Sequence, residues 1–256
     1  MRRRRIRRVS IARLTKISFL PSVFTTFNLF LGFLALMQIL RRNFITATYL
    51  VVIGVVMDGF DGTIARLTKT ESNFGMQLDS LVDAVTFGLV TSVLIYMWGF
   101  QDLNLQFGQV IGFIFLSAGV IRLARFNVFK EAKAFPDNVF VGLPIPLAAM
   151  AVLSIILRVE EPLQDKSCAL LFALFIMVIS FLMISNVKYR TLKRINPKYS
   201  LIVLIVLAGI IALSIMYPSY TIPMLTGLYL FSPLFITLVR KTKKKKSPAE
   251  IQGEPS

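Results

Sequence analysis

Histidine is missing from the 256-residue sequence, and cysteine occurs only once, as Cys168. Without histidine, the chain has no imidazole to act as a base, a nucleophile or a metal ligand, so carboxylates are the obvious chemical groups. A single cysteine allows no disulfide within the chain. Acidic residues are scarce as well, with 13 Asp and Glu against 29 Lys and Arg.

The resulting net charge of +16 would indicate a nucleic-acid partner in a soluble protein. Here, however, the basic residues lie between and outside long apolar runs, where they set the orientation of a membrane protein. We therefore predict no nucleic-acid partner.

Apolar runs recur along the whole chain, and 55% of its residues are hydrophobic. A helix of about 20 apolar residues crosses a ~30 Å hydrocarbon core and keeps its backbone hydrogen bonds within the segment. The sequence therefore predicts an all-α fold, a polytopic transmembrane bundle of about eight helices. Their expected ranges are 21–40, 44–67, 75–99, 106–127, 142–158, 167–187, 200–217 and 221–239.

The two ends of the chain are polar and basic. Residues 1–20 mix arginines with isoleucine, leucine and valine, which predicts an amphipathic juxtamembrane segment on the anionic inner leaflet. A role in fixing orientation alone is the alternative. Residues 240–256 predict a basic cytoplasmic tail that attracts anionic lipids. Between these ends, residues 21–239 form one predicted membrane domain.

Basic residues also predict the orientation of the helices. If the helices alternate in direction from a cytoplasmic N-terminus, 25 of the 29 Lys and Arg residues fall on the cytoplasmic side. This asymmetry follows the positive-inside rule. We expect a protein integral to the cytoplasmic membrane, with both termini and the short turn at 67–74 facing the cytoplasm.

Four aspartates interrupt the second and third predicted helices. Asp58 and Asp61 share one stripe of the helix at 44–67, and Asp79 and Asp83 are spaced i, i+4 on the next helix. The short turn makes these helices antiparallel neighbours. Both pairs lie roughly 6–12 Å along the helices from the turn, so they can converge on one cavity just below the cytoplasmic interface.

Four carboxylates in one cavity need compensating positive charge. Each costs at least ~2.5 kcal/mol to bury in the membrane, and all four repel one another. The basic side chain on these stripes, Arg66, lies at the rim. Hard divalent cations fit best, namely Mg²⁺, Mn²⁺ or Ca²⁺. Two such ions about 4 Å apart, sharing bridging carboxylates, would suit displacement at phosphorus.

Small residues share the aspartate stripes. Gly62 and Ala65 lie on the stripe of the first pair, and Gly75 begins the facing stripe. Such residues let a ligand approach the backbone, although close packing of helices would also select them. Arg66 and the turn residue Ser72 could donate hydrogen bonds to a phosphate group.

These residues fill every fixed position of the pattern DxxDGxxARx8GxxxDxxxD, and the region resembles the CDP-alcohol phosphotransferases. The resemblance covers the first six predicted helices, residues 21–187, and leaves 200–239 as an addition of two helices. It implies transfer of a substituted phosphate from a CDP-linked donor to an alcohol, with release of CMP. It also suggests a homodimer.

The resemblance implies roles for individual residues. Asp58 and Asp79 would bridge two divalent cations, Mg²⁺ or Mn²⁺, with Asp61 completing the first site and Asp83 the second. Asp83 would also be the general base toward the acceptor hydroxyl. The CDP pocket would be lined by Asp61, Gly62, Ala65, Arg66, Ser72 and Gly75.

Four further segments narrow the resemblance. The stretches PSVFTTFNLFLGFLAL, LDSLVDAVTFGLV, IRLARFNVF and VGLPIPLAAM resemble the membrane-integral phosphatidylserine synthases of bacteria and archaea. This branch implies CDP-diacylglycerol as the donor and L-serine as the acceptor. Glycerol 3-phosphate and inositol or inositol phosphate are the alternative acceptors within the family.

A serine acceptor carries a carboxylate, which calls for a cation. Arg122 and Arg125 lie at the cytoplasmic end of the fourth predicted helix, with Asn127 nearby. An arginine can hold a carboxylate through two parallel hydrogen bonds. Alternatively, these arginines anchor the helix at the membrane surface or bind lipid phosphate.

Two other classes of protein also use intramembrane carboxylates. A cation transporter would place acidic residues at mid-bilayer on several helices, whereas the four aspartates here share one depth near one face. An intramembrane prenyltransferase would carry two acidic motifs on well-separated helices, whereas here eight residues separate Arg66 from Gly75. Both alternatives therefore fit the spacing less well than a CDP-dependent transferase.

Overall fold

The computed structural model describes residues 19–68, 73–131, 139–190, 213 and 216–230. Three predicted segments fall largely or wholly outside these residues, namely the N-terminal segment, the basic tail at 240–256 and the helix at 200–217. Their predictions are therefore not addressed by the structure.

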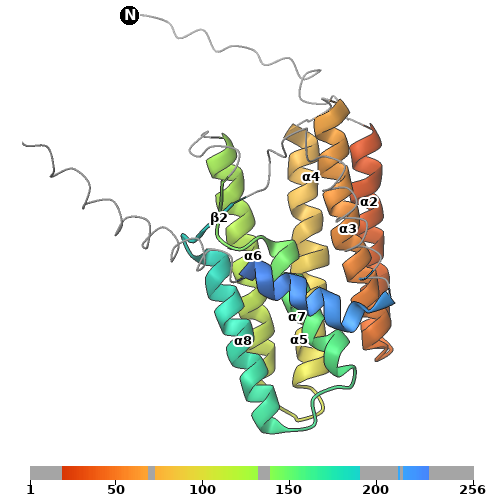
Figure 1. The fold of residues 1–256 in the computed structure, drawn as a ribbon, viewed down its shortest axis with the longest axis vertical. Helices are drawn as coiled ribbons and strands as arrows, with labels where there is room; N and C mark the ends of the chain where they lie inside the picture. The colour runs from red at the N-terminus through yellow and green to blue at the C-terminus, as the bar shows by residue number, and fades with distance from the viewer. Residues whose placement is uncertain (1–18, 69–72, 132–138, 191–212, 214–215, 231–256) are drawn as a thin grey trace, which may run out of the picture.

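The described chain is helical except for one short two-stranded ribbon. Long helices run side by side along the length of the molecule, and a helix over residues 218–230 crosses them (Figure 1). In chain order the helices are α2 (Phe19–Leu40), α3 (Phe44–Thr68), α4 (Asn73–Asp83), the π-helix η1 (Ala84–Val90), α5 (Thr91–Gly99), α6 (Phe107–Glu131), α7 (Ile145–Val159) and α8 (Lys166–Ile184).

Four helical stretches among the described residues are long and apolar enough to cross a membrane. They are Val23–Leu40, Phe74–Gly99, Phe107–Phe129 and Lys166–Ile184. Two shorter apolar helices, Phe44–Gly59 and Ile145–Val159, accompany them. This supports the predicted all-α membrane bundle in its coarse form.

The third predicted helix is one continuous helical stretch, but its middle has a different winding. The chain passes from α4 through η1 into α5 without a break between Phe74 and Gly99. A π-helix is rare and is frequently found at functional sites. Here it begins directly after Asp83, the last residue of α4.

One short element that the sequence did not predict accompanies the all-α bundle. Strands β1 (Val139–Val141) and β2 (Lys188–Arg190) form an antiparallel ribbon. The helices predicted at 142–158 and 167–187 are shorter in the structure, where they cover Ile145–Val159 and Lys166–Ile184. The residues that connect each strand to its helix are not helical. Gly142 has a φ of 80°, and its N–H donates to the carbonyl of Val187 at 2.8 Å.

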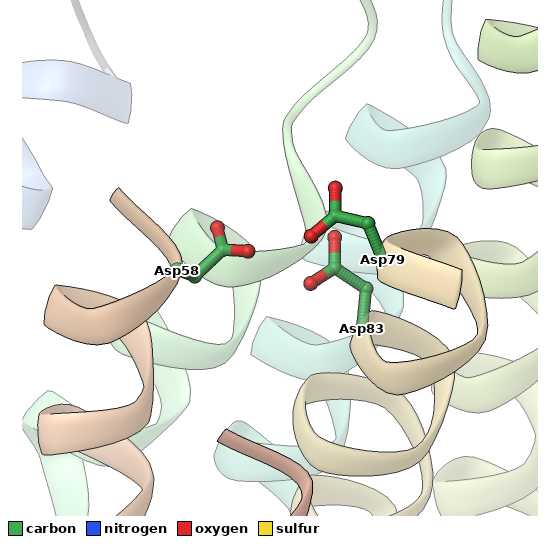
Figure 2. A group of neighbouring side chains, drawn as sticks. All are labelled: Asp58, Asp79 and Asp83. Atoms are coloured by element: carbon green, nitrogen blue, oxygen red, sulfur yellow. The ribbon is translucent and has the colours of Figure 1, made fainter. Parts of the chain in front are cut away.

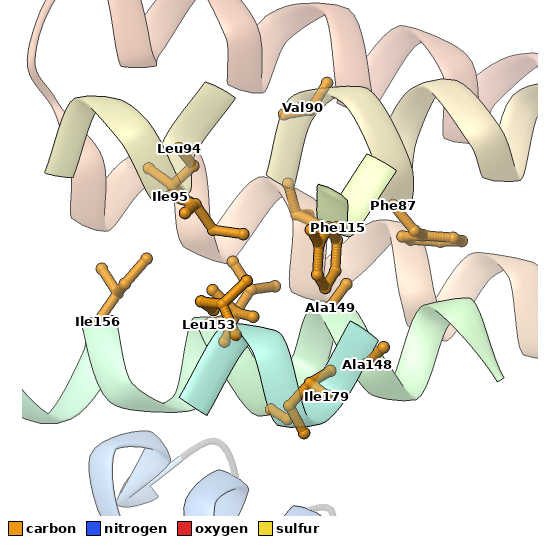
Figure 3. Packing of buried hydrophobic residues seen from close by; sticks show 14 of the residues in the cluster. Phe87, Val90, Leu94, Ile95, Phe115, Ala148, Ala149, Leu153, Ile156 and Ile179 are labelled. Carbon is orange, nitrogen blue, oxygen red and sulfur yellow. The ribbon is translucent and has the colours of Figure 1, made fainter. Parts of the chain in front are cut away.

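The centre of the bundle is α7, whose inward face packs against η1, α5, α6 and α8 (Figure 3). Trp98, Phe115 and Leu153 are among the buried side chains of this core. In a membrane, such a core is stabilised mainly by close packing, since the surrounding lipid is as apolar as the side chains. The packing of this core therefore determines the positions of the helices that carry the aspartates.

Replacing Leu153 with alanine tests this packing. Leu153 has no exposed surface, so Leu153→Ala leaves a cavity and should lower the free energy of unfolding by about 2 kcal/mol or more. Leu174→Ala is the matched control, because Leu174 on α8 is 61% exposed. Thermal unfolding in detergent, followed by circular dichroism, measures both. Equal losses of stability in the two variants would contradict the assigned core.

Candidate active site

Three aspartates from two helices meet at one place. Asp58 comes from the C-terminal half of α3, whereas Asp79 and Asp83 come from α4. One carboxylate oxygen from each lies within 4.8 Å of the others. Figure 2 shows the Asp58 side chain directed across the gap between the helices toward the other two.

Helical spacing explains this arrangement. Asp79 and Asp83 are four residues apart, so they project from the same face of α4. The chain returns from α3 to α4 within a few residues, so Asp58 faces them from a neighbouring helix. The three residues differ in burial, since Asp83 is only 7% exposed and the other two are partly buried.

The cluster fits a divalent cation. The Oδ1 atom of Asp83 is buried and has no hydrogen-bond donor among the described residues. Asp58 and Asp79 are close enough to repel the charge of Asp83. Carboxylate oxygens are the ligands that Mg²⁺, Mn²⁺ and Ca²⁺ prefer. A cation would supply both the missing partner of Oδ1 and the missing positive charge.

The remaining residues of the predicted nucleotide pocket are placed only by their backbone or not at all. Asp61, Gly62, Ala65 and Arg66 belong to the last turns of α3, beyond Asp58. Their side-chain positions, and residue Ser72, lie outside the described part of the structure. Gly75 lies in the first turn of α4, on the stripe of Asp79 and Asp83. The pocket therefore stays a prediction.

The three polar residues predicted near the end of the fourth helix have different surroundings. Arg122 on α6 is 5% exposed and lies within electrostatic range of Asp83. Its guanidinium carbon lies 5.3 Å from the centre of the Phe126 ring, and its Nε finds no acceptor among the described residues. Arg122 is thus a buried cation beside the acidic cluster.

Arg125, by contrast, is already bonded to the protein. Its Nη1 donates to the carbonyl of Ile184 at 2.6 Å, and its Nη2 donates to those of Val141 and Ser185 at 3.2 and 3.0 Å. A basic side chain that binds the last carbonyls of a helix satisfies groups that the helix leaves unpaired. Arg125 thereby joins the end of α8 to strand β1.

Asn127 also makes contacts within the protein. Its Nδ2 donates to the hydroxyl of Ser80 at 3.0 Å, which ties α6 to α4 next to Asp79. Ser80 in turn donates to the carbonyl of Met76. Asn127 therefore supports the helix that carries two of the aspartates.

A second layer of contacts below the cluster was not anticipated from the sequence. The Thr86 hydroxyl of η1 donates to the carbonyl of Asn28 on α2 at 3.4 Å. Gly54 lies four residues before Asp58. A Cβ atom at position 54 would lie only 2.7 Å from Oδ1 of Asn28, so the glycine leaves room for the Asn28 side chain. The sequence feature that could have indicated these contacts is the polar residue Asn28 within an apolar run.

Carboxylates that meet between apolar helices indicate a functional site in a membrane protein. The family model of CDP-alcohol phosphatidyltransferase matches residues 18–185. The chain therefore belongs to this family, as the aspartate pattern predicted.

Several curated proteins are similar to this chain over most of its length. A CDP-diacylglycerol–serine O-phosphatidyltransferase of Helicobacter pylori is 33% identical over 211 residues, which cover 82% of this chain and 87% of the relative. Proteins of the same name from Methanocaldococcus jannaschii and Bacillus subtilis are 32% and 31% identical. They cover 72% and 69% of this chain, and 76% and 93% of the relatives' own lengths.

Binding of Mn²⁺ tests the acidic cluster without any assay of activity. Asp79→Asn removes one negative ligand while keeping the shape of the side chain, so it should weaken Mn²⁺ binding by at least about tenfold. Electron paramagnetic resonance of free Mn²⁺ measures this affinity. Asp102→Asn is the control, since Asp102 pairs with Arg42 at 2.7 Å outside the cluster. Unchanged binding in Asp79→Asn would exclude this cluster as the metal site.

Proposed function

We propose that this protein transfers the phosphatidyl group of CDP-diacylglycerol to L-serine and forms phosphatidylserine and CMP. Membership of the family and the names of the similar proteins support this reaction. The main structural support is that Asp58, Asp79 and Asp83 meet in one partly buried cluster.

The reaction is a substitution at phosphorus. The serine hydroxyl oxygen attacks the phosphorus that carries diacylglycerol, and the bond from this phosphorus to the bridging oxygen of CMP breaks. CMP leaves with that oxygen and its electron pair. Asp83 accepts the proton of the serine hydroxyl as the general base.

Two divalent cations, Mg²⁺ or Mn²⁺, are proposed to neutralise the diphosphate and the charge on the leaving group when they are bound. Ca²⁺ is also compatible with the oxygen ligands. Asp58 and Asp79 would be shared between the ions, Asp61 would complete one site and Asp83 the other. The proposed CDP pocket consists of Asp61, Gly62, Ala65, Arg66, Ser72 and Gly75.

Among the three candidates for the serine site, we assign the carboxylate to Arg122. Arg122 is buried beside Asp83 and has a free Nε–H among the described residues. Arg125 and Asn127 already bind backbone carbonyls and Ser80. We therefore propose that Arg125 and Asn127 stabilise the structure around the site, and that Arg122 binds serine or a lipid phosphate directly.

The protein is proposed to be a homodimer integral to the cytoplasmic membrane, with about eight helices. Both termini and the acidic cluster would face the cytoplasm, since 25 of the 29 basic residues fall on that side if the helices alternate. The basic segments 1–20 and 240–256 would contact anionic lipids on either side of the membrane domain at 21–239.

A screen of acceptors tests the reaction. Purified protein in detergent with CDP-diacylglycerol and Mn²⁺ should release CMP when L-serine is added and form a serine-containing lipid. Glycerol 3-phosphate and inositol should give only the background rate of CMP release. Turnover with glycerol 3-phosphate but not with serine would exclude serine as the acceptor, whereas the assignment to the family would remain valid.

The role of Asp83 is tested by its conversion to asparagine. Asp83→Asn removes the proton acceptor, so kcat should fall by at least about a hundredfold, the lower limit for general base catalysis. Asp102→Asn, in a loop outside the cluster, should keep the rate of the unmodified protein. CMP release at saturating serine measures both variants. A rate in Asp83→Asn within threefold of the unmodified rate would show that another group takes the proton.

A further inference from the structure

Three helices meet closely at Gly54 of α3, one helical turn before Asp58. A Cβ atom at this position would lie 2.7 Å from Oδ1 of Asn28 on α2, and 3.5 and 3.7 Å from side-chain carbons of Thr86 and Phe87 on η1. The first distance is shorter than two side chains can approach without a bond between them. The close contact of α2 with α3 therefore requires glycine at position 54.

A second set of contacts joins α2 to η1. The Thr86 hydroxyl donates to the carbonyl of Asn28 at 3.4 Å. One turn further along α2, a Cβ atom at Gly32 would lie 2.6 Å from Oγ1 and 3.1 Å from Cβ of Thr86. Both Asn28 and Thr86 are buried. The helix α2 thus packs closely against α3 and η1, although the three clustered carboxylates lie on α3 and α4.

These contacts lie about one helical turn from the carboxylates on each side. Asp58 follows Gly54 by four residues, so the two share one face of α3. Thr86 follows Asp83 by three residues in the continuous stretch that joins α4 to η1. A shift of α3 or of η1 against α2 would therefore change the separation of Asp58 from Asp83.

Stability alone does not account for an asparagine at position 28. Its buried Oδ1 has no donor among the described residues, and a buried polar atom without a partner is unfavourable. Polar residues within membrane-spanning helices are costly and mark functional sites. The position of Asn28, between the helices that carry or adjoin the clustered carboxylates, indicates what this function is.

We propose that Asn28 is a positioning residue that sets the separation of Asp58 from Asp83, and thereby the affinity of the cluster for divalent cations. It acts through its side-chain contact with Gly54 and through the bond from Thr86 to its carbonyl. The proposal rests on the metal-dependent function proposed above and deepens it. Mn²⁺ binding is measured without substrates, so protein that binds Mn²⁺ but makes no serine lipid would refute the serine reaction alone.

Gly54→Ala tests the contact between α2 and α3. The added methyl group meets Oδ1 of Asn28 and displaces α3, so Mn²⁺ should bind at least about tenfold more weakly, the lower limit for residues that orient metal ligands. Gly59→Ala is the matched control beside Asp58, because a Cβ atom at Gly59 would meet no atom within 4 Å. It should bind Mn²⁺ as the unmodified protein does. Unchanged binding in Gly54→Ala would overturn the proposal.

Gly99→Ala distinguishes positioning of the cluster from a general effect of crowding. A Cβ atom at Gly99 would also lie 2.7 Å from a side-chain atom, Cε1 of Phe172. Gly99 is, however, the last residue of the helical stretch Phe74–Gly99, several turns beyond Asp83. Gly99→Ala should lower the temperature of thermal unfolding and keep the Mn²⁺ affinity. An equal loss of affinity in Gly99→Ala and Gly54→Ala would contradict a specific role of the contact at Gly54.

The role of Asn28 itself is tested by combining variants. Asn28→Ala removes the side chain that separates α2 from α3, so it should weaken Mn²⁺ binding without introducing a clash. It therefore tests the proposal even if Gly54→Ala does not fold. Adding Gly54→Ala to Asn28→Ala should weaken binding no further, because the methyl group no longer meets Oδ1. Electron paramagnetic resonance of free Mn²⁺ measures all variants. Unchanged affinity in Asn28→Ala, or independent, multiplicative effects of the two substitutions, would refute the positioning role.

Discussion

The repulsion among three carboxylates in an apolar helical bundle is the constraint on which the rest of the structure depends. Asp58, Asp79 and Asp83 bring oxygens within 4.8 Å of one another, although even a single charge is costly to bury within a membrane-spanning segment. Arg122 offsets part of this charge. Divalent cations would offset the remainder, so we expect that metal binding stabilises the pairing of α3 with α4 as well as preparing the site for a diphosphate.

The surrounding helices hold the carboxylates in place through hydrogen bonds outside the cluster. Asn127 binds Ser80 beside Asp79, and Thr86 ties η1 to α2 three residues after Asp83. The π-helix begins where α4 ends, so the change in winding starts at the most buried aspartate. A site built in this way keeps its geometry before substrate arrives, which is what catalysis by positioning requires.

The sequence predicted the helical bundle and the meeting of Asp58, Asp79 and Asp83, because both depend on local spacing, whereas the predicted place of Asp61 in the cluster stays a prediction. The i, i+4 separation places Asp79 and Asp83 on one face, the short turn returns the chain from α3 to α4, and both helices pack against α2. The ribbon formed by Val139–Val141 and Lys188–Arg190 depends instead on contacts between distant segments. Such contacts cannot be predicted from the residue pattern of one segment. The hydrogen bonds of Arg125 to the end of α8 could not be predicted for the same reason.

Locating Mn²⁺ by anomalous scattering in crystals of the protein tests the central claim most directly. The account predicts anomalous peaks between α3 and α4, within coordination distance of carboxylate oxygens of Asp58, Asp79 and Asp83. Peaks found only elsewhere on the protein, in crystals that form phosphatidylserine when dissolved with both substrates, would contradict it.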